Sequence, residues 1–518
     1  MDKYFDTFRV SRLFFQRSLA FIYFIAFASS LNQFPTLLGE KGFLPVAEFI
    51  RQVPFKQAPS LFYLGYSDTF FLVVAWLGIL FSFVFVLGLL EKLPWWILTA
   101  AWLVMWSLYL SIVNVGQAFY GFGWESMLLE AGFFSAFLTS QRLATSFVPI
   151  FILRWMLFRV ELGAGLIKLR GDECWRNLTC LEYHYETQPL PNSLSCLFHS
   201  FPEWIQRVSV LFSHFVQLVV PFGLFAPRRI AALSGALIIF HQMLLIVSGN
   251  YSWLNWLTIV LGLTALGDFT WRTLFLQTDT NNLTALFDKF LRGLSSRLRG
   301  NDRGSPYLLT EQGAARSASY SGLIYALAGL TILLSVQPTL NFFARNQMMN
   351  YNYNPFHLVG SYGAFGSVNK ERYEIVIEGT SDLLLTSKTE WKEYQFKAKP
   401  GDIYQRPPQI APYHLRLDWM MWFLPFSVSI GPEGKLVHSY ELWFLKLIVR
   451  LLQADQHTLK LLKSSPFQNQ SPRYIRALFY HYQYTDSQER NKTGAWWKRE
   501  LMGEYLPPVT FNQMERFQ

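Results

Sequence analysis

The sequence predicts a polytopic α-helical membrane protein with about nine spans and a C-terminal extracytoplasmic α+β domain that contains a small antiparallel sheet. Hydrophobic residues make up 51% of the 518-residue chain and charged residues only 15%, whereas a soluble globular chain carries nearer a quarter. The apolar residues gather in long runs in the first two thirds of the chain, while the last third has strand-like alternation. From this contrast we expect lipid around the first two thirds of the chain and water around the last third.

A membrane span needs about 20 mainly apolar residues. The clearest runs are 70–90, 94–113, 230–247 and 320–336. Weaker runs are 18–34, 119–139, 144–169, 204–226 and 252–269. The run that follows Arg17 lacks a small-residue cleavage motif, so we interpret it as a retained span and not as a cleavable signal peptide.

Basic residues predict the orientation, because short cytoplasmic loops are enriched in Lys and Arg. If the nine spans alternate, the N-terminus and every second connection fall on one side. These segments carry Lys3, Arg9, Arg12, Arg17, Lys92, Arg142, Arg228, Arg229 and the cluster within 272–316. We therefore expect a cytoplasmic N-terminus. The net charge of +10 is explained in this way, and no nucleic-acid partner is predicted.

The predicted domain organisation has four parts. Residues 1–272 form a helical transmembrane domain with outer loops 35–69 and 170–203, and residues 273–319 a basic cytoplasmic linker. A last transmembrane helix covers 320–338, and an extracytoplasmic α+β domain covers 339–518. In that domain we expect strands at 373–378, 391–397, 473–484 and 495–501, and helices at 416–424 and 441–452.

Ionisable side chains inside predicted spans are costly unless they are paired or lie near water. The middle spans contain Glu125, Glu130, Arg154, Arg159, Glu161 and Lys168. One interpretation is internal ion pairs that hold the helices in register, and the other is a polar cavity open to the outer side. His214 and His241 lie in later spans without metal-ligand spacing, so we expect no metal and no cofactor.

Lys168 follows Gly163-Ala164-Gly165, whose small residues allow helices to approach closely. It lies at the predicted outer boundary of its span. Its side chain could extend to the interface, or a low-dielectric pocket could hold it as a general base.

The loop 170–203 is polar and aromatic, as recognition surfaces often are. Its candidate client-binding residues are Trp175, Arg176, Tyr183, His184, Tyr185 and Glu186. The same loop holds Cys174, Cys180 and Cys196, which are all the cysteines of the chain. In an oxidising compartment they allow one disulfide and one free thiol, and three free thiols are the alternative.

Several longer strings of residues resemble one known family. They lie at 114–117, 122–125, 128–130, 165–175, 183–192, 354–357, 361–363, 371–380, 399–402, 416–419 and 503–508. On these residues the chain resembles the lipase maturation factor family over nearly its whole length. The resemblance implies a polytopic protein that helps secreted lipases to fold, in the endoplasmic reticulum membrane of animals. The compact chain and its basic linker are more similar to bacterial members, for which the inner membrane is expected.

A fainter similarity concerns the span that ends at Lys168. Its Ala-Gly, Lys-Leu, Asp and Trp pattern is similar to the vitamin K-dependent carboxylase-like membrane family, in which the matching Lys is a proposed base in quinone chemistry. This similarity covers roughly a dozen positions.

Two hypotheses of function follow. The first is a membrane-bound maturation or folding factor without catalysis, whose partners are the bilayer and a secreted client protein such as a lipase. The alternative is a membrane enzyme that acts on a quinone or another lipid-soluble substrate. In that case Lys168 would be the base, and Glu125, Glu130 or Arg154 would position the substrate or stabilise charge.

Overall fold

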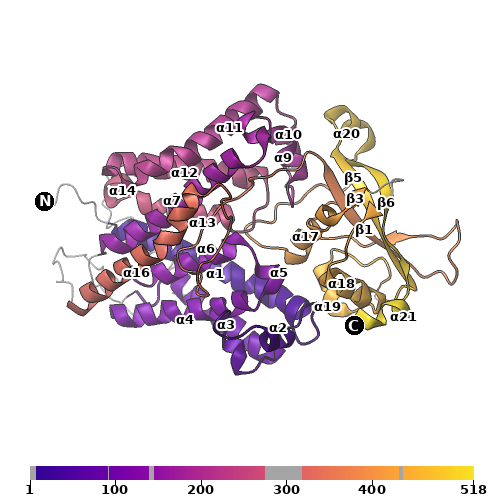
Figure 1. The fold of residues 1–518 in the computed structure, drawn as a ribbon, viewed down its shortest axis with the longest axis horizontal. Helices are drawn as coiled ribbons and strands as arrows, with labels where there is room; N and C mark the ends of the chain where they lie inside the picture. Colours follow the sequence, from indigo (N-terminus) through magenta and orange to yellow (C-terminus); the bar gives the residue numbers. More distant parts are fainter. Residues whose placement is uncertain are drawn as a thin grey trace, which may run out of the picture.

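The computed structural model describes residues 8–91, 93–138, 145–274, 318–430, 436–468 and 470–517. Long helices fill one part of the molecule, and a sheet with short helices forms the other end (Figure 1). Most of the predicted linker 273–319, together with Lys3, Lys92 and Arg142, lies outside the described residues. We use the name C-terminal unit for residues 372–517 and crossing segment for residues 344–371.

The helical part comprises long helices joined by short ones. The long helices are α1 (Arg9–Leu38), α3 (Asp68–Val86), α4 (Trp95–Asn114), α6 (Gly123–Ser135), α7 (Phe147–Arg170), α11 (Glu203–Leu218), α12 (Arg228–Ser248) and α16 (Ala318–Phe343). The shorter ones are α2 (Val46–Gln52), η1 (Leu61–Leu64), α5 (Gln117–Tyr120), α8 (Glu173–Arg176), α9 (Leu181–Thr187), α10 (Ser195–His199), η2 (Val220–Phe225), α13 (Leu254–Gly262), η3 (Leu263–Ala265) and α14 (Asp268–Leu274).

Local sequence signals explain where several of these helices begin. Pro94, Pro202 and Pro227 each stand directly before a long helix, where a proline restricts the preceding residue and gives up no helical hydrogen bond. Helix α3 begins after Ser67, whose hydroxyl accepts a hydrogen bond from the Phe70 N–H at 3.1 Å.

Six described helices are long and apolar enough to cross a membrane. They are Arg9–Leu38, Asp68–Val86, Trp95–Asn114, Glu203–Phe225, Arg228–Ser248 and Ser319–Phe343. Each coincides with one of the predicted runs, so the chain is an integral membrane protein with several spans. Their outward faces carry exposed apolar side chains, such as Trp76 and Leu233, as a lipid environment requires.

The other three predicted runs do not form such helices. Helix α6 has 13 residues, about 20 Å at 1.5 Å per residue, against roughly 30 Å of hydrocarbon. The run 252–269 forms only the shorter apolar helix Leu254–Ala265. Helix α7 has 24 residues and is mostly buried, but it carries several charged side chains. A count of nine spans therefore stays a prediction.

The sheet of the C-terminal unit has four antiparallel strands in the order β2-β1-β5-β6. They are β1 (Arg372–Thr380), β2 (Lys392–Glu393), β5 (Tyr474–Tyr484) and β6 (Trp497–Val509). The register of β1 and β5 opposes Tyr373 to His481. The predicted small antiparallel sheet is confirmed, although the run 391–397 contributes only the two residues of β2.

Short elements surround this sheet. They are α17 (Arg416–Met421), η4 (Leu424–Ser427), β3 (Ser429–Ile430), β4 (Leu436–Val437), α18 (Leu442–Leu452), α19 (Gln456–Leu461), α20 (Ser487–Thr493), α21 (Phe511–Met514) and η6 (Glu515–Phe517). The predicted helices at 416–424 and 441–452 correspond to α17 and α18. Helix α18 buries its apolar side chains, including Phe444 and Ile448.

A buried ion pair joins the C-terminal unit to the helical part. Arg416 at the start of α17 lies 2.7 Å from the Glu125 carboxylate of α6, and both side chains are fully buried. The Tyr109 hydroxyl donates to the same carboxylate at 2.5 Å. The Arg416 guanidinium lies over the Tyr120 ring and donates to the Phe119 carbonyl. Helix α17 of the C-terminal unit is therefore anchored to the helical part through a buried charge.

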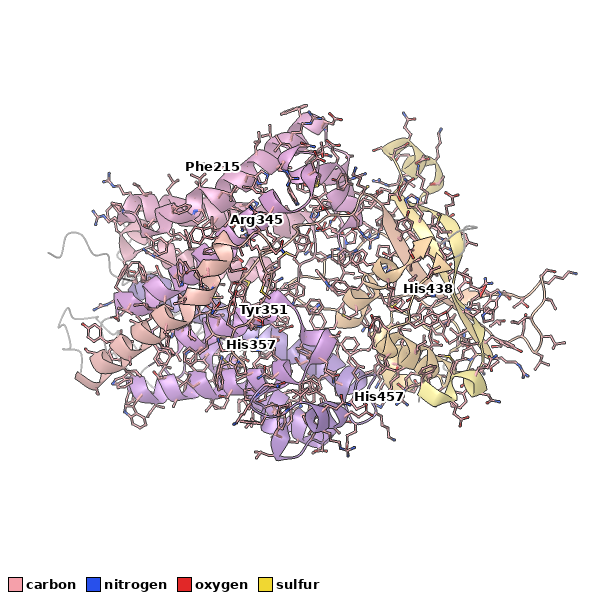
Figure 2. The ribbon with its side chains drawn as sticks, viewed as in Figure 1. Phe215, Arg345, Tyr351, His357, His438 and His457 are labelled. Carbon is pink, nitrogen blue, oxygen red and sulfur yellow. A yellow bond between two sulfur atoms is a disulfide. The ribbon has the colours of Figure 1, made fainter. Side chains whose placement is uncertain are left out.

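The crossing segment forms a second buried connection. The Glu130 carboxylate pairs with Arg159 of α7 and accepts hydrogen bonds from the Gly360 N–H at 3.0 Å and the Tyr362 hydroxyl at 2.7 Å. Gly163 of α7 leaves room for the Tyr362 carbonyl, which a Cβ atom would strike. His357 on the same segment (Figure 2) contacts Asn114 and Ser126 through its two ring nitrogens.

These contacts predict that Arg416→Met is strongly destabilising. The change leaves the Glu125 carboxylate buried without its cation, which costs about 3–5 kcal/mol. Thermal unfolding of the detergent-solubilised protein measures the loss. The matched control is Lys498→Met in the exposed Lys498–Glu489 pair, which should leave the melting temperature nearly unchanged. Equal melting temperatures for the two variants would contradict the role given to the buried pair.

Candidate functional site

The candidate site is a cavity of about 510 Å³ between the membrane helices, the loop 170–203 and the C-terminal unit. Helices α6, α7, α11, α12 and α13 contribute side chains from the membrane part. The crossing segment and the region around α17 close the remaining side. The site thus exists only where the two halves of the chain meet.

Most of the cavity wall is apolar and aromatic. The wall includes aromatic side chains from the helices, the crossing segment and the C-terminal unit, namely Trp124, Phe212, Phe365, Trp419 and Phe423. The Trp124 and Trp419 rings meet edge to face, with centroids 4.9 Å apart. Such a wall suits the hydrocarbon or ring system of an apolar ligand.

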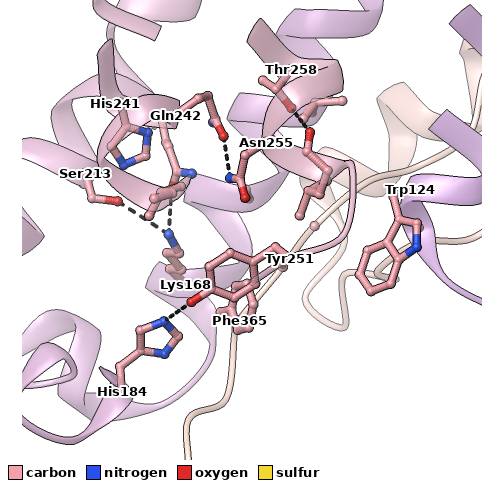
Figure 3. Close-up of a pocket in the computed structure, with 18 of the residues that line it drawn as sticks. Trp124, Lys168, His184, Ser213, His241, Gln242, Tyr251, Asn255, Thr258 and Phe365 are labelled. Atoms are coloured by element: carbon pink, nitrogen blue, oxygen red, sulfur yellow. Dashed lines mark hydrogen bonds between the residues drawn. The ribbon is translucent and has the colours of Figure 1, made fainter. Parts of the chain in front are cut away.

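Lys168 lies at the polar end of the cavity (Figure 3). Its Nζ atom donates to Gln217 Oε1 at 2.9 Å and to Ser213 Oγ at 3.4 Å, both on α11. The same atom lies 4.7 Å from the centroid of the Trp175 ring. The ammonium group is therefore held inside the protein, where Lys168 is 6% exposed, and a role as general base stays a prediction.

Glu161 faces the same cavity, seven residues before Lys168 and so on the same face of α7. Gln242 Nε2 donates to Glu161 Oε1 at 2.8 Å, and Asn255 Nδ2 donates to Gln242 Oε1 at 2.7 Å. The second carboxylate oxygen, Oε2, is buried and has no hydrogen-bond partner among the described residues. A buried, unsatisfied acceptor in a cavity is unfavourable unless a ligand supplies a donor.

His184 and Tyr251 form the outer polar corner (Figure 3). The Tyr251 hydroxyl donates to Gln188 Oε1 at 2.7 Å, so it accepts from His184 Nε2 at 2.9 Å. Burial lowers the pKa of His184 to about 3, and the nearby Lys168 charge lowers it further. His184 is therefore a neutral, structural hydrogen-bond donor at neutral pH.

The other predicted catalytic residues lie outside this cavity. Glu125 and Glu130 are held by the ion pairs with Arg416 and Arg159. Arg154 donates to the carbonyl oxygens of Thr264 and Leu224 at 3.0 and 3.2 Å. The structure thus brings Lys168 together with Glu161, and assigns Glu125, Glu130 and Arg154 to contacts that hold helices and segments together.

Most of the candidate client-binding residues are buried, contrary to the expectation of exposed aromatics. Trp175, His184, Tyr185 and Glu186 are each less than 9% exposed. Glu186 Oε1 accepts from the Tyr484 N–H at 2.5 Å, and burial raises the pKa of this carboxyl. The loop 170–203 is covered by the crossing segment and the C-terminal unit, which leaves Arg176 exposed and Tyr183 half-buried.

Arg372 fixes the end of this loop to the sheet. Its guanidinium donates to the carbonyl oxygens of Glu186 and Pro189 at 2.9 and 3.1 Å, and pairs with Glu374 at 2.5 Å. Lys399 completes the cluster at 2.8 Å from the same carboxylate. The conformation of the loop is thus set by the C-terminal unit.

The cysteines follow the first of the two predicted alternatives. Cys174 and Cys180 form a disulfide, and Cys196 is free and buried. Arg490 Nη2 lies 2.7 Å from the Cys196 Sγ atom. The disulfide links the two ends of the short segment 174–180, which contains Trp175, and the ring of Trp175 lies next to the Lys168 ammonium.

Sequence reasoning did not assemble Ser213, Gln217, Gln242, Tyr251 and Asn255 into one site. The available signal was that each is polar within or beside an apolar run. Four of these residues lie on three different helices, and Tyr251 lies between two of the helices, so only the packing shows that they converge. Among the described residues, no group of three or more His, Cys, Asp or Glu side chains is placed to hold a metal ion.

The architecture defines a class of protein. It is a polytopic membrane protein whose C-terminal α+β unit packs over an aromatic cavity. Two protein-family models match the chain in agreement with this division. The lipase maturation factor transmembrane domain matches residues 10–273, and the lipase maturation factor C-terminal domain matches residues 358–507. The chain belongs to the lipase maturation factor family.

Curated relatives match over nearly the full chain. Lipase maturation factor 1 of Mus musculus is 38% identical and covers 99% of this chain and 89% of its own length. The Homo sapiens protein of the same name is 38% identical over 99% of this chain and 90% of its own length. Lipase maturation factor 2 of Xenopus laevis is 30% identical over 97% of this chain and 82% of its own length. No solved structure matches.

The disulfide predicts the outcome of thiol labelling. In the denatured but unreduced protein, a maleimide reagent should add once, at Cys196, and after reduction it should add three times. Intact-mass spectrometry counts the added groups. A Cys196→Ser variant serves as control and should take up none before reduction. Three additions without reduction would show that the disulfide is not formed.

Proposed function

We propose that this protein is a membrane-bound maturation factor that helps secreted lipases to fold and assemble. The supporting observation is the match to Lipase maturation factor 1, which runs through the membrane helices and the C-terminal unit without omitting either. The relatives found are named for lipase maturation, so the comparisons do not favour the alternative of a membrane enzyme.

We further propose that the C-terminal unit lies on the extracytoplasmic side and the N-terminus in the cytoplasm. A disulfide such as Cys174–Cys180 persists in oxidising compartments. The loop that carries it is bound to the crossing segment, where Trp175 Nε1 donates to the Phe365 carbonyl at 2.8 Å. Helix α14 and the start of α16 lie at the opposite end of the molecule (Figure 1). In the sequence these two helices flank the basic segment, and basic segments favour the cytoplasmic side.

A client-binding surface is offered by the connection between β1 and β2. This connection projects from the end of the molecule away from the helical part (Figure 1). Leu383 and Leu384 in it are 71% and 77% exposed. Adjacent exposed leucines are unusual on a soluble surface and can bind apolar segments of an incompletely folded polypeptide. Arg176 and Tyr183 are the remaining accessible members of the predicted client-binding set and would extend the contact.

The client proposal is tested by replacing the exposed leucines. Leu383→Ser with Leu384→Ser should leave the abundance and melting temperature of the protein unchanged, because neither side chain is packed. It should lower the secreted activity of a co-expressed lipase at least severalfold. The matched control is Leu501→Ser, an exposed leucine on β6. Unchanged lipase secretion after deletion of the whole gene would overturn the proposed function itself.

The orientation is tested by fusing reporters to the two ends of the full-length chain. An alkaline phosphatase fused after residue 518 should be active and a green fluorescent protein at the same place dark. At residue 1 the two reporters should behave in the opposite way, because the two ends are proposed to lie in different compartments. Reporters that behave identically at both ends would contradict an odd number of spans.

A further inference from the structure

We propose that the cavity binds an uncharged lipid alcohol that enters from the bilayer between α11 and α12. The hydroxyl group of this ligand would lie between Lys168 and Glu161, and its hydrocarbon along the aromatic wall. The inference goes beyond client maturation and rests on the cavity, on two buried polar groups that face it and on its connection to the membrane-facing surface.

The polar end of the cavity is complementary to a hydroxyl group. The Lys168 ammonium has three N–H donors, and two of them are accounted for by Gln217 and Ser213. Glu161 Oε2 is an acceptor without a partner among the described residues, in a side chain that is 1% exposed. A hydroxyl group can accept from the first and donate to the second. The cavity therefore offers one donor and one acceptor at the same end.

The basic Lys168 and the acidic Glu161 at the same end of the cavity disfavour a charged head group. A carboxylate or phosphate would be attracted by Lys168 but repelled by Glu161. A charged amine would be attracted by Glu161 but repelled by Lys168. An uncharged group that both donates and accepts avoids either penalty in a site shielded from water. His241, whose Nδ1 atom also lacks a partner in the described part of the chain, lines the same end.

The remaining wall is suited to hydrocarbon. Phe122, Trp124, Phe212 and Phe365 contribute rings from three different parts of the chain. A cavity of about 510 Å³ is in the range that binds a small lipid-sized molecule.

The cavity is continuous with the lipid-facing surface. Val208 of α11 lines the cavity and is also 55% exposed. It lies on a helix whose other outward residues, Trp204, Leu211 and Phe215, are exposed and apolar; Figure 2 shows Phe215 on the outer side of α11. Ser209 and Phe212 beside Val208 are half-buried cavity residues. A ligand can therefore enter from the membrane without crossing water, which favours a lipid.

The test compares oleyl alcohol, oleate, oleylamine and methyl oleate, which share one hydrocarbon chain and differ in the head group. Binding to the full-length protein in detergent is titrated by native mass spectrometry. Oleyl alcohol should bind at least about tenfold more tightly than the other three, since each of those leaves a buried donor or acceptor unpaired or opposes a charge. Preference for oleate, or no saturable binding of any of the four, would overturn the proposal.

Two kinds of variant locate the binding. Ser209→Trp narrows the opening at a half-buried position and should lower the affinity for oleyl alcohol at least about tenfold. Leu211→Trp, on the exposed face of the same helix, should leave the affinity unchanged. Glu161→Gln should remove the preference for the alcohol over methyl oleate if the protein folds. Equal affinities for the two tryptophan variants would place the binding elsewhere and refute the site.

Discussion

The ion pair between Glu125 and Arg416 connects the two halves of this protein, and much of the architecture depends on it. Both side chains are fully buried, and they come from positions almost 300 residues apart in the chain. Neither charge is tolerable in the interior without the other. Separation of the C-terminal unit from the helices would therefore expose or orphan both charges, so the two halves are held as one structure and the cavity between them is kept closed on that side.

The second connection, through Glu130, shapes the crossing segment in the same way. The carboxylate pairs with Arg159 and accepts hydrogen bonds from the Gly360 N–H and the Tyr362 hydroxyl. These contacts hold residues 360–365 against α7. Gly163 permits this close approach. Phe365 is then in position both to accept from Trp175 and to line the cavity. Buried charges that are costly in isolation thus position a segment that has no regular secondary structure.

The cavity and the proposed maturation role concern different surfaces of the protein. Exposed leucines beyond the sheet are suited to a polypeptide, whereas the aromatic cavity between the helices and the C-terminal unit is suited to a lipid. The C-terminal unit takes part in both, because Trp419 and Phe423 line the cavity and the β1–β2 connection belongs to the same unit. Occupancy of the cavity would stabilise the docking of the unit by binding only the assembled state.

The sequence by itself determined the membrane class, six of the spans, the small antiparallel sheet and the family, because long apolar runs and strand alternation are local patterns. It also singled out Lys168, which proved to face the cavity. Local patterns did not reveal that 119–139 and 252–269 form helices too short to qualify as spans.

Only the tertiary structure decided which polar residues belong together. In the sequence, each of five charged residues stands within an apolar run: Glu125, Glu130, Arg154, Glu161 and Lys168. Of these five, only Glu161 and Lys168 line the cavity. Trp175 and Tyr185 lie in a polar loop, yet both are buried, and Trp175 clusters with Phe365 and Val368 of the crossing segment. The physical reason is that the partners of these groups lie on other elements of the chain, for example 45 residues away for Lys168 and Ser213 and 230 for Glu130 and Gly360. Burial likewise depends on packing that a local sequence pattern does not contain.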